Sequence, residues 1–170
     1  MIREATQKDL TDILEIYNDA ILHTTAVYTY KPQTLKSREI WFKQKMEAGY
    51  PIIVNEQDNK VAGFATFGPF RDWPAFKYSI EHSIYVDKKY RKKGIASSLM
   101  KEIIAIARAR EYMTMVAGID AANEQSIAMH EKFGFIHAGT IKKAGFKFSQ
   151  WRDLAFYQLK LKGPENPTEE

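Results

Sequence analysis

Apolar residues recur with helical spacing in two segments at the N-terminal end. The first segment is preceded by Thr6-x-x-Asp9, which resembles a capping box at the start of a helix. Its apolar positions are Leu10, Ile13, Leu14, Ile16 and Tyr17. The second segment runs from about Thr34 or Ser37 to Ala48, because Gly49 and Pro51 are typical of a helix end. The pattern predicts two helices in this part of the chain.

Strand patterns follow in the middle of the chain. Residues 52–56 and 60–67 are joined by Asp58-Asn59, a hairpin signal. The loop 68–76 is rich in Gly, Pro and aromatic residues. Residues 78–86 then alternate in a way that predicts a strand. One face of this strand would hold Tyr78, Ile80, His82, Ile84 and Val86, and the other Ser79, Glu81, Ser83 and Tyr85, unless a bulge interrupts it.

Helix and strand patterns alternate in the rest of the chain. The predicted helices are 95–110 and 123–132, and the predicted strands are 112–119 and 153–161. The complete order predicts an α+β (mixed α/β) fold, in which one central mixed sheet has helices on both faces. We expect a single domain over residues 1–162, followed by a frayed polar C-terminal tail at 163–170.

Composition narrows the possible chemistry. The chain has 170 residues, of which 45% are hydrophobic, with a formal net charge of +4 and no cysteine. A mild positive charge suits a protein that binds anionic small molecules and does not require nucleic acid. Without cysteine there is no disulfide, cysteine nucleophile or thiolate metal site, and the histidines lack metal-ligand spacing, so no metal is expected. Neither a secretory signal nor a membrane-spanning run occurs, so we expect a cytoplasmic protein that does not contact a membrane.

A basic turn joins the strand that ends at Val86 to the helix that begins near Ile95. Five of the six residues at 88–93 are Lys or Arg, and the small residues Gly94 and Ala96 allow the backbone to approach a ligand closely. The helix start adds unpaired N–H groups and the positive end of the helix dipole. These features are typical of a pyrophosphate site, although a solvated charge run before an amphipathic helix has the same composition.

Two motifs resemble those of the GNAT superfamily of N-acetyltransferases. Arg91-Lys92-Lys93-Gly94-Ile95-Ala96 is similar to its Arg/Gln-x-x-Gly-x-Gly/Ala signature. Further along, Asn123-x-x-Ser126-x-x-x-His130-Glu131-Lys132-x-Gly134-Phe135 is similar to its second signature, an Asn-containing helix that ends in Gly-Phe. The first motif also follows a strand and opens a long helix. The resemblance implies the GNAT fold with its mostly antiparallel central sheet, acetyl-CoA as cosubstrate and N-acetyl transfer.

Nearly the whole chain resembles one subfamily, the phosphinothricin and methionine sulfoximine acetyltransferases. The similar segments are residues 16–20, 49–52, 81–86 and 144–148, with Trp151 and Asp153. Ala96 departs from the Gly that close relatives often have, and the loop at 70–74 differs in detail. The resemblance implies a homodimer that acetylates the α-amine of a small glutamate-like amino acid. Phosphinothricin, methionine sulfoximine and methionine sulfone are the type acceptors, and antibiotic or herbicide resistance is the implied role.

The resemblance also implies a role for individual residues. Glu81 is expected as the general base, and His130 as the acid that protonates the departing CoA thiolate. The residues expected to contact acetyl-CoA are Ile84, Tyr85, Val86, Arg91, Lys92, Lys93, Gly94, Ile95, Ala96, Ser97, Asn123 and Ser126. The residues expected to contact the acceptor are Arg71, Asp72, Trp73, Glu81, His82 and Ser83.

Each of these roles has a structural alternative. Glu81 lies mid-strand among apolar residues, where a carboxylate is costly unless it is paired or functional, so an ion pair would also explain it. His130 would equally cap a backbone carbonyl, and Asn123 would equally cap its helix. Arg71 would equally be an exposed loop residue paired with Asp72.

Two other functions fit the same residues. A GNAT fold also modifies polyamines, aminoglycosides or protein N-termini, because a fold does not fix the substrate. A non-catalytic nucleic-acid-binding module would use the basic patch at 88–93, but no DNA- or RNA-binding motif accompanies it. An Arg or Lys near Glu81 would favour a carboxylated amino acid, whereas an acidic pocket would favour a polycation.

Overall fold

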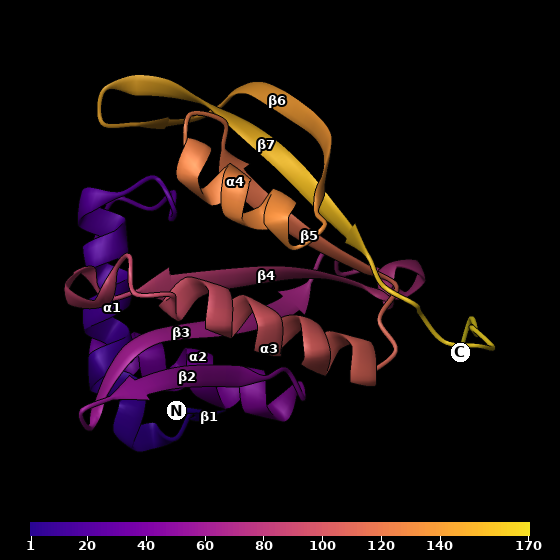
Figure 1. Cartoon of the computed structure of the whole chain (residues 1–170), viewed down its shortest axis with the longest axis horizontal. Helices are drawn as coiled ribbons and strands as arrows, with labels where there is room; N and C mark the ends of the chain where they lie inside the picture. The colour runs from indigo at the N-terminus through magenta and orange to yellow at the C-terminus, as the bar shows by residue number, and fades with distance from the viewer. The chain divides into compact units, whose positions relative to one another are not determined.

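The computed structural model describes residues 1–170 and contains every predicted helix and strand, together with two strands that the patterns did not predict (Figure 1). The helices are α1 (Leu10–His23), α2 (Leu35–Glu47), α3 (Ile95–Ala109) and α4 (Glu124–Lys132). The strands are β1 (Ile2–Glu4), β2 (Ile52–Gln57), β3 (Lys60–Pro69), β4 (Ser79–Val86), β5 (Thr114–Asp120), β6 (Ile136–Lys147) and β7 (Gln150–Lys160). The unpredicted strands are β1 and β6.

Seven strands form one mixed sheet in the order β1-β2-β3-β4-β5-β7-β6. The β4–β5 pair is parallel, whereas the pairs β1–β2, β2–β3, β5–β7 and β6–β7 are antiparallel. The predicted α+β fold with a mostly antiparallel sheet is therefore confirmed. The chain clusters into two compact units, of which unit 1 contains residues 1–67 and 83–103 and unit 2 contains residues 68–82 and 104–170. Both β4 and α3 continue from one unit into the other.

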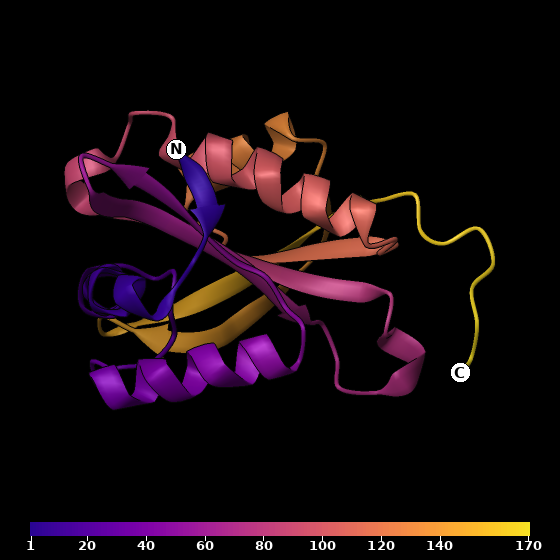
Figure 2. The same ribbon diagram turned by 90° about the horizontal axis from the view of Figure 1, so that it is seen from below.

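In unit 1, α1 and α2 lie on one side of β2 and β3, and the N-terminal part of α3 lies on the other (Figure 2). The core between them includes Leu10, Ile13, Ile16, Val54 and Phe64. The three residues from α1 are apolar positions that the helical spacing predicts to be buried. Each fully buried side chain of this size contributes about 1.5–3 kcal/mol.

Gly63 explains how closely the elements of unit 1 approach one another. A Cβ atom at this position of β3 would lie 2.9 Å from the carbonyl oxygen of Tyr85 and 3.0 Å from the side chain of Ile95. Only glycine leaves room for this contact, because backbone atoms have no alternative rotamer. The glycine thus sets the distance from β3 to the second half of β4 and to the start of α3.

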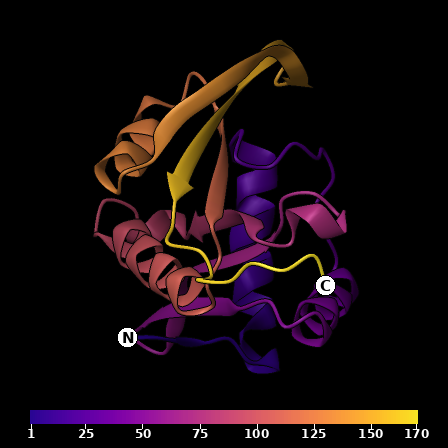
Figure 3. The ribbon, with the colours of Figure 1, turned by 90° about the vertical axis from the view of Figure 1, so that its right-hand side faces the viewer.

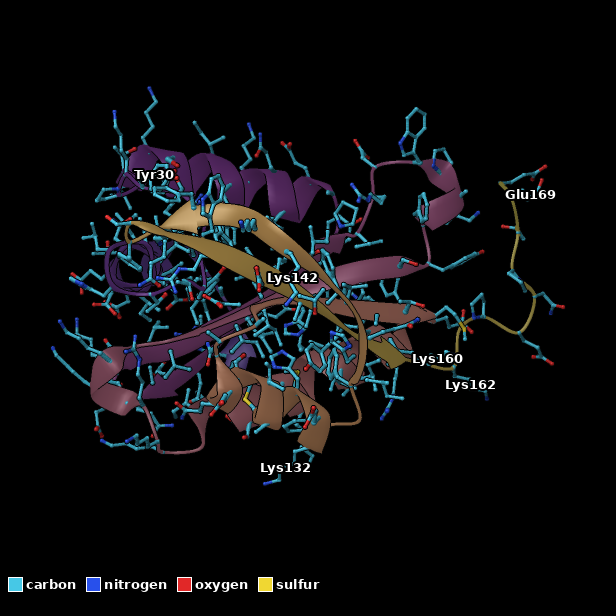
Figure 4. The ribbon with its side chains drawn as sticks, turned by 90° about the horizontal axis from the view of Figure 1, so that it is seen from above. Tyr30, Lys132, Lys142, Lys160, Lys162 and Glu169 are labelled. Atoms are coloured by element: carbon cyan, nitrogen blue, oxygen red, sulfur yellow. The ribbon has the colours of Figure 1, made fainter.

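In unit 2, β6 and β7 form a long hairpin, orange to yellow in Figure 3, with α4 on one side of it. β5 pairs with β7 over its whole length, from Thr114–Lys160 to Asp120–Leu154. Lys142, labelled in Figure 4, forms an ion pair of 3.3 Å with Asp153 across the hairpin. The buried apolar residues here include Ile80, Met115, Ala117, Ile119, Phe135, Ala155, Tyr157 and Leu159.

The sequence and the structure also compare at strand β6, at the C-terminal tail and in the search for membrane-spanning helices. The patterns missed β6 because most of its side chains are exposed and its register with β7 shifts twice, so it shows no clean alternation. The C-terminal tail was expected to fray, but the Thr168 N–H donates a hydrogen bond of 3.0 Å to the Tyr78 hydroxyl. No helix is both long and apolar enough to cross a membrane.

Candidate active site

The basic turn of unit 1 has the backbone that an anion site requires. β4 ends at Val86, a short 3-10 turn spans Lys88–Tyr90, and α3 begins at Ile95, as the sequence predicted. Gly94 has a φ of +78°, and a Cβ placed on it would meet no atom within 4 Å. The first amides of a helix have no partner within that helix. The turn therefore offers free N–H donors beside open space.

Some basic side chains of this turn are paired with an acidic residue, and others are exposed. Lys92, Lys93 and Arg91 are exposed. Arg91 donates a hydrogen bond of 3.1 Å to Asp19 of α1, and the Lys88 ammonium lies 3.9 Å from the same carboxylate. An exposed ion pair of this kind contributes only about 0–1 kcal/mol, so an anionic ligand competes with it easily.

In unit 2, Glu81 is an exposed residue of β4. Strand alternation directs its neighbours Ile80 and His82 inward and places Glu81 on the opposite face. The nearby protein still removes part of its hydration, which raises the pKa of the Glu81 carboxyl above its usual 4.5, and the positive charge of Arg71 partly offsets this effect. Gly118 on β5 leaves space beside the carboxylate, since a Cβ there would lie 4.0 Å from Glu81 Oε1.

The loop before β4 presents a cation and an aromatic ring to solvent. Arg71, Asp72 and Trp73 are all exposed, Trp73 by 72%. The Arg71 guanidinium lies 5.4 Å from the centre of the Phe70 ring and forms no ion pair with Asp72 within 4.0 Å, so the alternative explanation of Arg71 as the partner of Asp72 is not supported. Arg71 thus keeps its donors available near Glu81.

Two predicted site histidines lie in the interior of unit 2 instead of facing a ligand. His82 is 7% exposed and His130 is 5% exposed, and their Nε2 atoms are 3.1 Å apart. The His82 side chain therefore does not contact an acceptor, which corrects that expectation. His130 Nδ1 lies 2.7 Å from the carbonyl oxygen of Ser126, so His130 caps a backbone carbonyl, the structural alternative given above. Both of its ring nitrogens are therefore engaged within the protein.

Protonation also disfavours an acidic role for this pair. Burial, with the neighbouring His130 as a smaller cause, lowers the pKa of His82 to about 3. Burial likewise lowers the pKa of His130, although its hydrogen bond to Ser126 opposes the shift. Both shifts favour the neutral imidazole, which is a poor acid.

The remaining cofactor candidates hold structural roles that leave their polar atoms near the surface. Asn123 is exposed and caps α4, because its side-chain oxygen accepts a hydrogen bond of 3.1 Å from the Ser126 N–H. The cofactor candidates Ile84, Tyr85 and Val86 are half-buried, as is the acceptor candidate Ser83. The Tyr85 ring packs edge-on against Tyr17, with 5.4 Å between ring centres.

Sequence reasoning missed one unusual cation in unit 1. Arg38 of α2 is 7% exposed, and its guanidinium lies 4.3 Å from the centre of the Tyr17 ring and 4.6 Å from that of Trp41. Its Nε atom is buried without a hydrogen-bond partner. The helical spacing of Arg38 and Trp41 was the only available signal, and it does not distinguish a stacked arginine from an exposed one.

Comparison with known proteins gives consistent results. Residues 10–135 match the Acetyltransferase (GNAT) family. An L-methionine sulfoximine/L-methionine sulfone acetyltransferase of Pseudomonas aeruginosa is 40% identical over 161 residues, 94% of each chain. An N-acetyltransferase structure from Staphylococcus aureus Mu50 is 59% identical with a TM-score of 0.94, covering 95% of this chain and 98% of that one. A phosphinothricin acetyltransferase from Sinorhizobium meliloti, solved with acetyl-CoA, is 33% identical with a TM-score of 0.92 and coverages of 97% and 93%.

Proposed function

This chain belongs to the acetyltransferase (GNAT) family, and we propose that it transfers the acetyl group of acetyl-CoA to the α-amine of a small glutamate-like amino acid. The central observation is the exposed Glu81 carboxyl. Desolvation raises its pKa, and the positive charge of Arg71 partly offsets that shift. A base and a carboxylate-binding cation in the same unit match an amino-acid acceptor. Residues 1–162 would act as one acetyltransferase domain, since β4 and α3 belong to both units.

The proposed acetyl-CoA contacts use backbone N–H groups and exposed polar side chains. The turn at 91–97 would hold the pyrophosphate through backbone N–H groups and exposed lysines, and the open space at Gly94 fits an approaching phosphate. The backbone of residues 84–86 would hydrogen-bond the pantetheine, and Asn123 and Ser126 would contact the cofactor from α4. In this proposal the basic turn serves phosphate groups and not nucleic acid.

Glu81 would accept the proton that the acceptor amine loses. Acetyl-CoA, when bound, supplies a thioester whose carbonyl carbon the amine attacks directly in a ternary complex. A free α-amine has a pKa of about 7.7–8.0, against about 10.4 for lysine, so deprotonating an α-amine is easier by roughly 3 kcal/mol. A carboxylate with a raised pKa therefore suffices for an α-amino acceptor. The departing thiolate, with a pKa near 8.5, can be protonated by water without His130.

A side-by-side acceptor assay tests this proposal. Methionine sulfoximine, methionine sulfone and phosphinothricin would be compared with spermidine, an aminoglycoside and a peptide with a free N-terminus, and released CoA thiol would be measured. We expect the three amino acids to give the highest kcat/KM. A higher value for the polyamine, aminoglycoside or peptide would contradict the acceptor class while leaving acetyl transfer intact.

Replacing Arg71 with alanine is expected to raise the KM for methionine sulfoximine by about 10- to 100-fold, because a charge-assisted hydrogen bond contributes about 1.5–3 kcal/mol. The KM for acetyl-CoA should remain nearly unchanged. Asp72→Ala tests a second expected acceptor contact in the same loop, and a smaller effect there would show that the loss depends on the charge of Arg71. An acceptor KM equal to wild type in Arg71→Ala would remove Arg71 from the site.

We also propose that the protein is a homodimer that associates through exposed apolar side chains of the β6–β7 hairpin. This hairpin surface is defined by Ile136, Ile141, Phe146, Phe148 and Trp151, which are exposed by 73%, 53%, 46%, 48% and 61%. Large apolar side chains gathered on one exposed element are typical of an interaction site. The Phe146 and Trp151 rings pack against each other, with 5.2 Å between their centres, so they are already ordered.

Light scattering should give about twice the chain mass of 19.6 kDa for the wild-type protein. Trp151→Lys should shift the mass toward the monomer, because it places a charge within the hairpin surface. Ile40→Lys, which changes a residue of α2 that is 50% exposed, should leave the mass unchanged. A wild-type monomer at micromolar concentration would exclude this assembly.

A further inference from the structure

The buried histidine pair has only one arrangement of protons that satisfies its geometry. The backbone carbonyl oxygen of Ser126, 2.7 Å from His130 Nδ1, can only accept, so His130 Nδ1 must carry a hydrogen. A neutral imidazole has one N–H, which leaves His130 Nε2 as an acceptor. The Nε2–Nε2 contact of 3.1 Å is then a hydrogen bond donated by His82. His82 Nδ1 is left as a bare nitrogen, consistent with its lack of any partner in the interior.

Neighbouring residues enclose this pair and exclude a charged form. The two rings are nearly parallel, with centres 5.1 Å apart and planes inclined by 20°. Phe135 packs edge-on against both, at 5.6 Å from His82 and 5.1 Å from His130. A proton added to His82 Nδ1 would create a buried N–H without an acceptor. The pair therefore acts as a neutral polar link between β4 and α4.

The link lies at the point in β4 where its pairing with β5 ends. The parallel pairing of β4 with β5 joins Ser79–Thr114, Ile80–Met115 and Glu81–Val116. His82 is the first residue of β4 after the last of these pairs. Because successive side chains of a strand point to opposite faces, holding the His82 side chain inward fixes the direction in which the Glu81 carboxylate points outward.

We propose that His82 is a positioning residue for acetyl transfer, which donates from Nε2 to His130 and thereby holds the Glu81 carboxylate in its reactive orientation. This inference rests on the proposed role of Glu81 as the base. A catalytic group must be held within about 0.5 Å of its productive position, and supporting hydrogen bonds provide that restraint. His82 acts through Glu81 and touches neither substrate.

The proton arrangement can be tested directly on the wild-type protein. Nitrogen NMR of histidine-labelled protein should show the Nδ1–H tautomer for His130 and the Nε2–H tautomer for His82, both neutral at pH 7. Substitution of each histidine in turn assigns the signals. Finding His130 as the Nε2–H tautomer, or either ring charged at pH 7, would overturn the inference without any measurement of activity.

Two substitutions separate the hydrogen bond from simple packing. His82→Gln retains an Nε–H donor of similar reach, whereas His82→Leu fills similar space without a donor. We expect kcat to fall about tenfold or more in His82→Leu, with acetyl-CoA KM within about twofold of wild type, and His82→Gln to recover most of the loss. Equal kcat in a folded His82→Leu protein would contradict the positioning role.

A double-mutant cycle distinguishes failure of this inference from failure of the proposed function. If His82 acts through Glu81, His82→Leu should have almost no further effect on kcat in a Glu81→Gln background. A full additional loss in that background would show that His82 acts elsewhere. If Glu81→Gln alone is as active as wild type, the proposed base is wrong, while the tautomers of the pair are still decided by NMR.

Discussion

Substituting glutamine for Glu81 is expected to lower kcat by about two to four orders of magnitude, the range that a positioned general base contributes. Glutamine has nearly the same shape but cannot accept the proton of the acceptor amine at neutral pH. The dissociation constant for acetyl-CoA should stay close to wild type, because Glu81 carries no proposed contact with the CoA phosphates. Steady-state kinetics with methionine sulfoximine and a thiol readout, together with acetyl-CoA titration, measure both quantities.

The pH profile provides a second test of the same residue. A base must be deprotonated to act, so kcat/KM should fall as pH decreases through the pKa of Glu81. Desolvation raises this pKa above 4.5, which places the loss at a higher pH than an ordinary glutamate would show. This fall in kcat/KM at low pH should be absent in Glu81→Gln. It should persist in Glu102→Gln, which changes an exposed carboxylate of α3. A wild-type rate in Glu81→Gln would mean that the base lies elsewhere.

Features set by local sequence were predictable. The capping box at Thr6 is present, since the Thr6 N–H donates a hydrogen bond of 2.7 Å to Asp9, although it opens a 3-10 turn before α1 begins at Leu10. The strand–turn–helix around Gly94 was also predictable, because a basic turn and a small residue lie within a few positions of each other. In these cases the partners are close in the chain.

Features that depend on distant partners were not predictable. His82 and His130 are 48 positions apart, and neither sequence context indicates that the two rings meet. The pair changes the interpretation of both residues, from an acceptor contact and a proton donor to a buried link. Similarly, β6 is a strand because β7 pairs with it, and its own residues do not alternate.

The proposed acceptor site was predictable only in part. Arg71 precedes the Glu81 strand in the sequence, but only the structure brings its positive charge close enough to lower the pKa of the Glu81 carboxyl and so oppose the effect of desolvation. Loop conformation, unlike helix or strand periodicity, has no repeating signal from which side-chain exposure can be predicted.

Acetyl-CoA binding should be lost when a negative charge is placed on the anion-binding turn at Gly94. We expect Gly94→Asp to raise the dissociation constant for acetyl-CoA by about 100-fold more than Gly94→Asn does. Two unit charges at 4 Å in a partly solvated site repel by as much as about 4 kcal/mol, enough for an effect of this size. Calorimetric titration of the two variants with acetyl-CoA measures the difference.

Asparagine is the matched control because it has the same shape as aspartate and carries no charge. Gly94 has a left-handed φ of +78°, which costs most residues energy, but Asn and Asp tolerate this region better than other non-glycine residues. Since a Cβ at Gly94 meets no atom within 4 Å, steric conflict should be similar and small in both variants. The difference between them should shrink as salt concentration rises, because mobile ions screen the repulsion. Equal affinity of the Asp and Asn variants for acetyl-CoA would show that the pyrophosphate binds elsewhere.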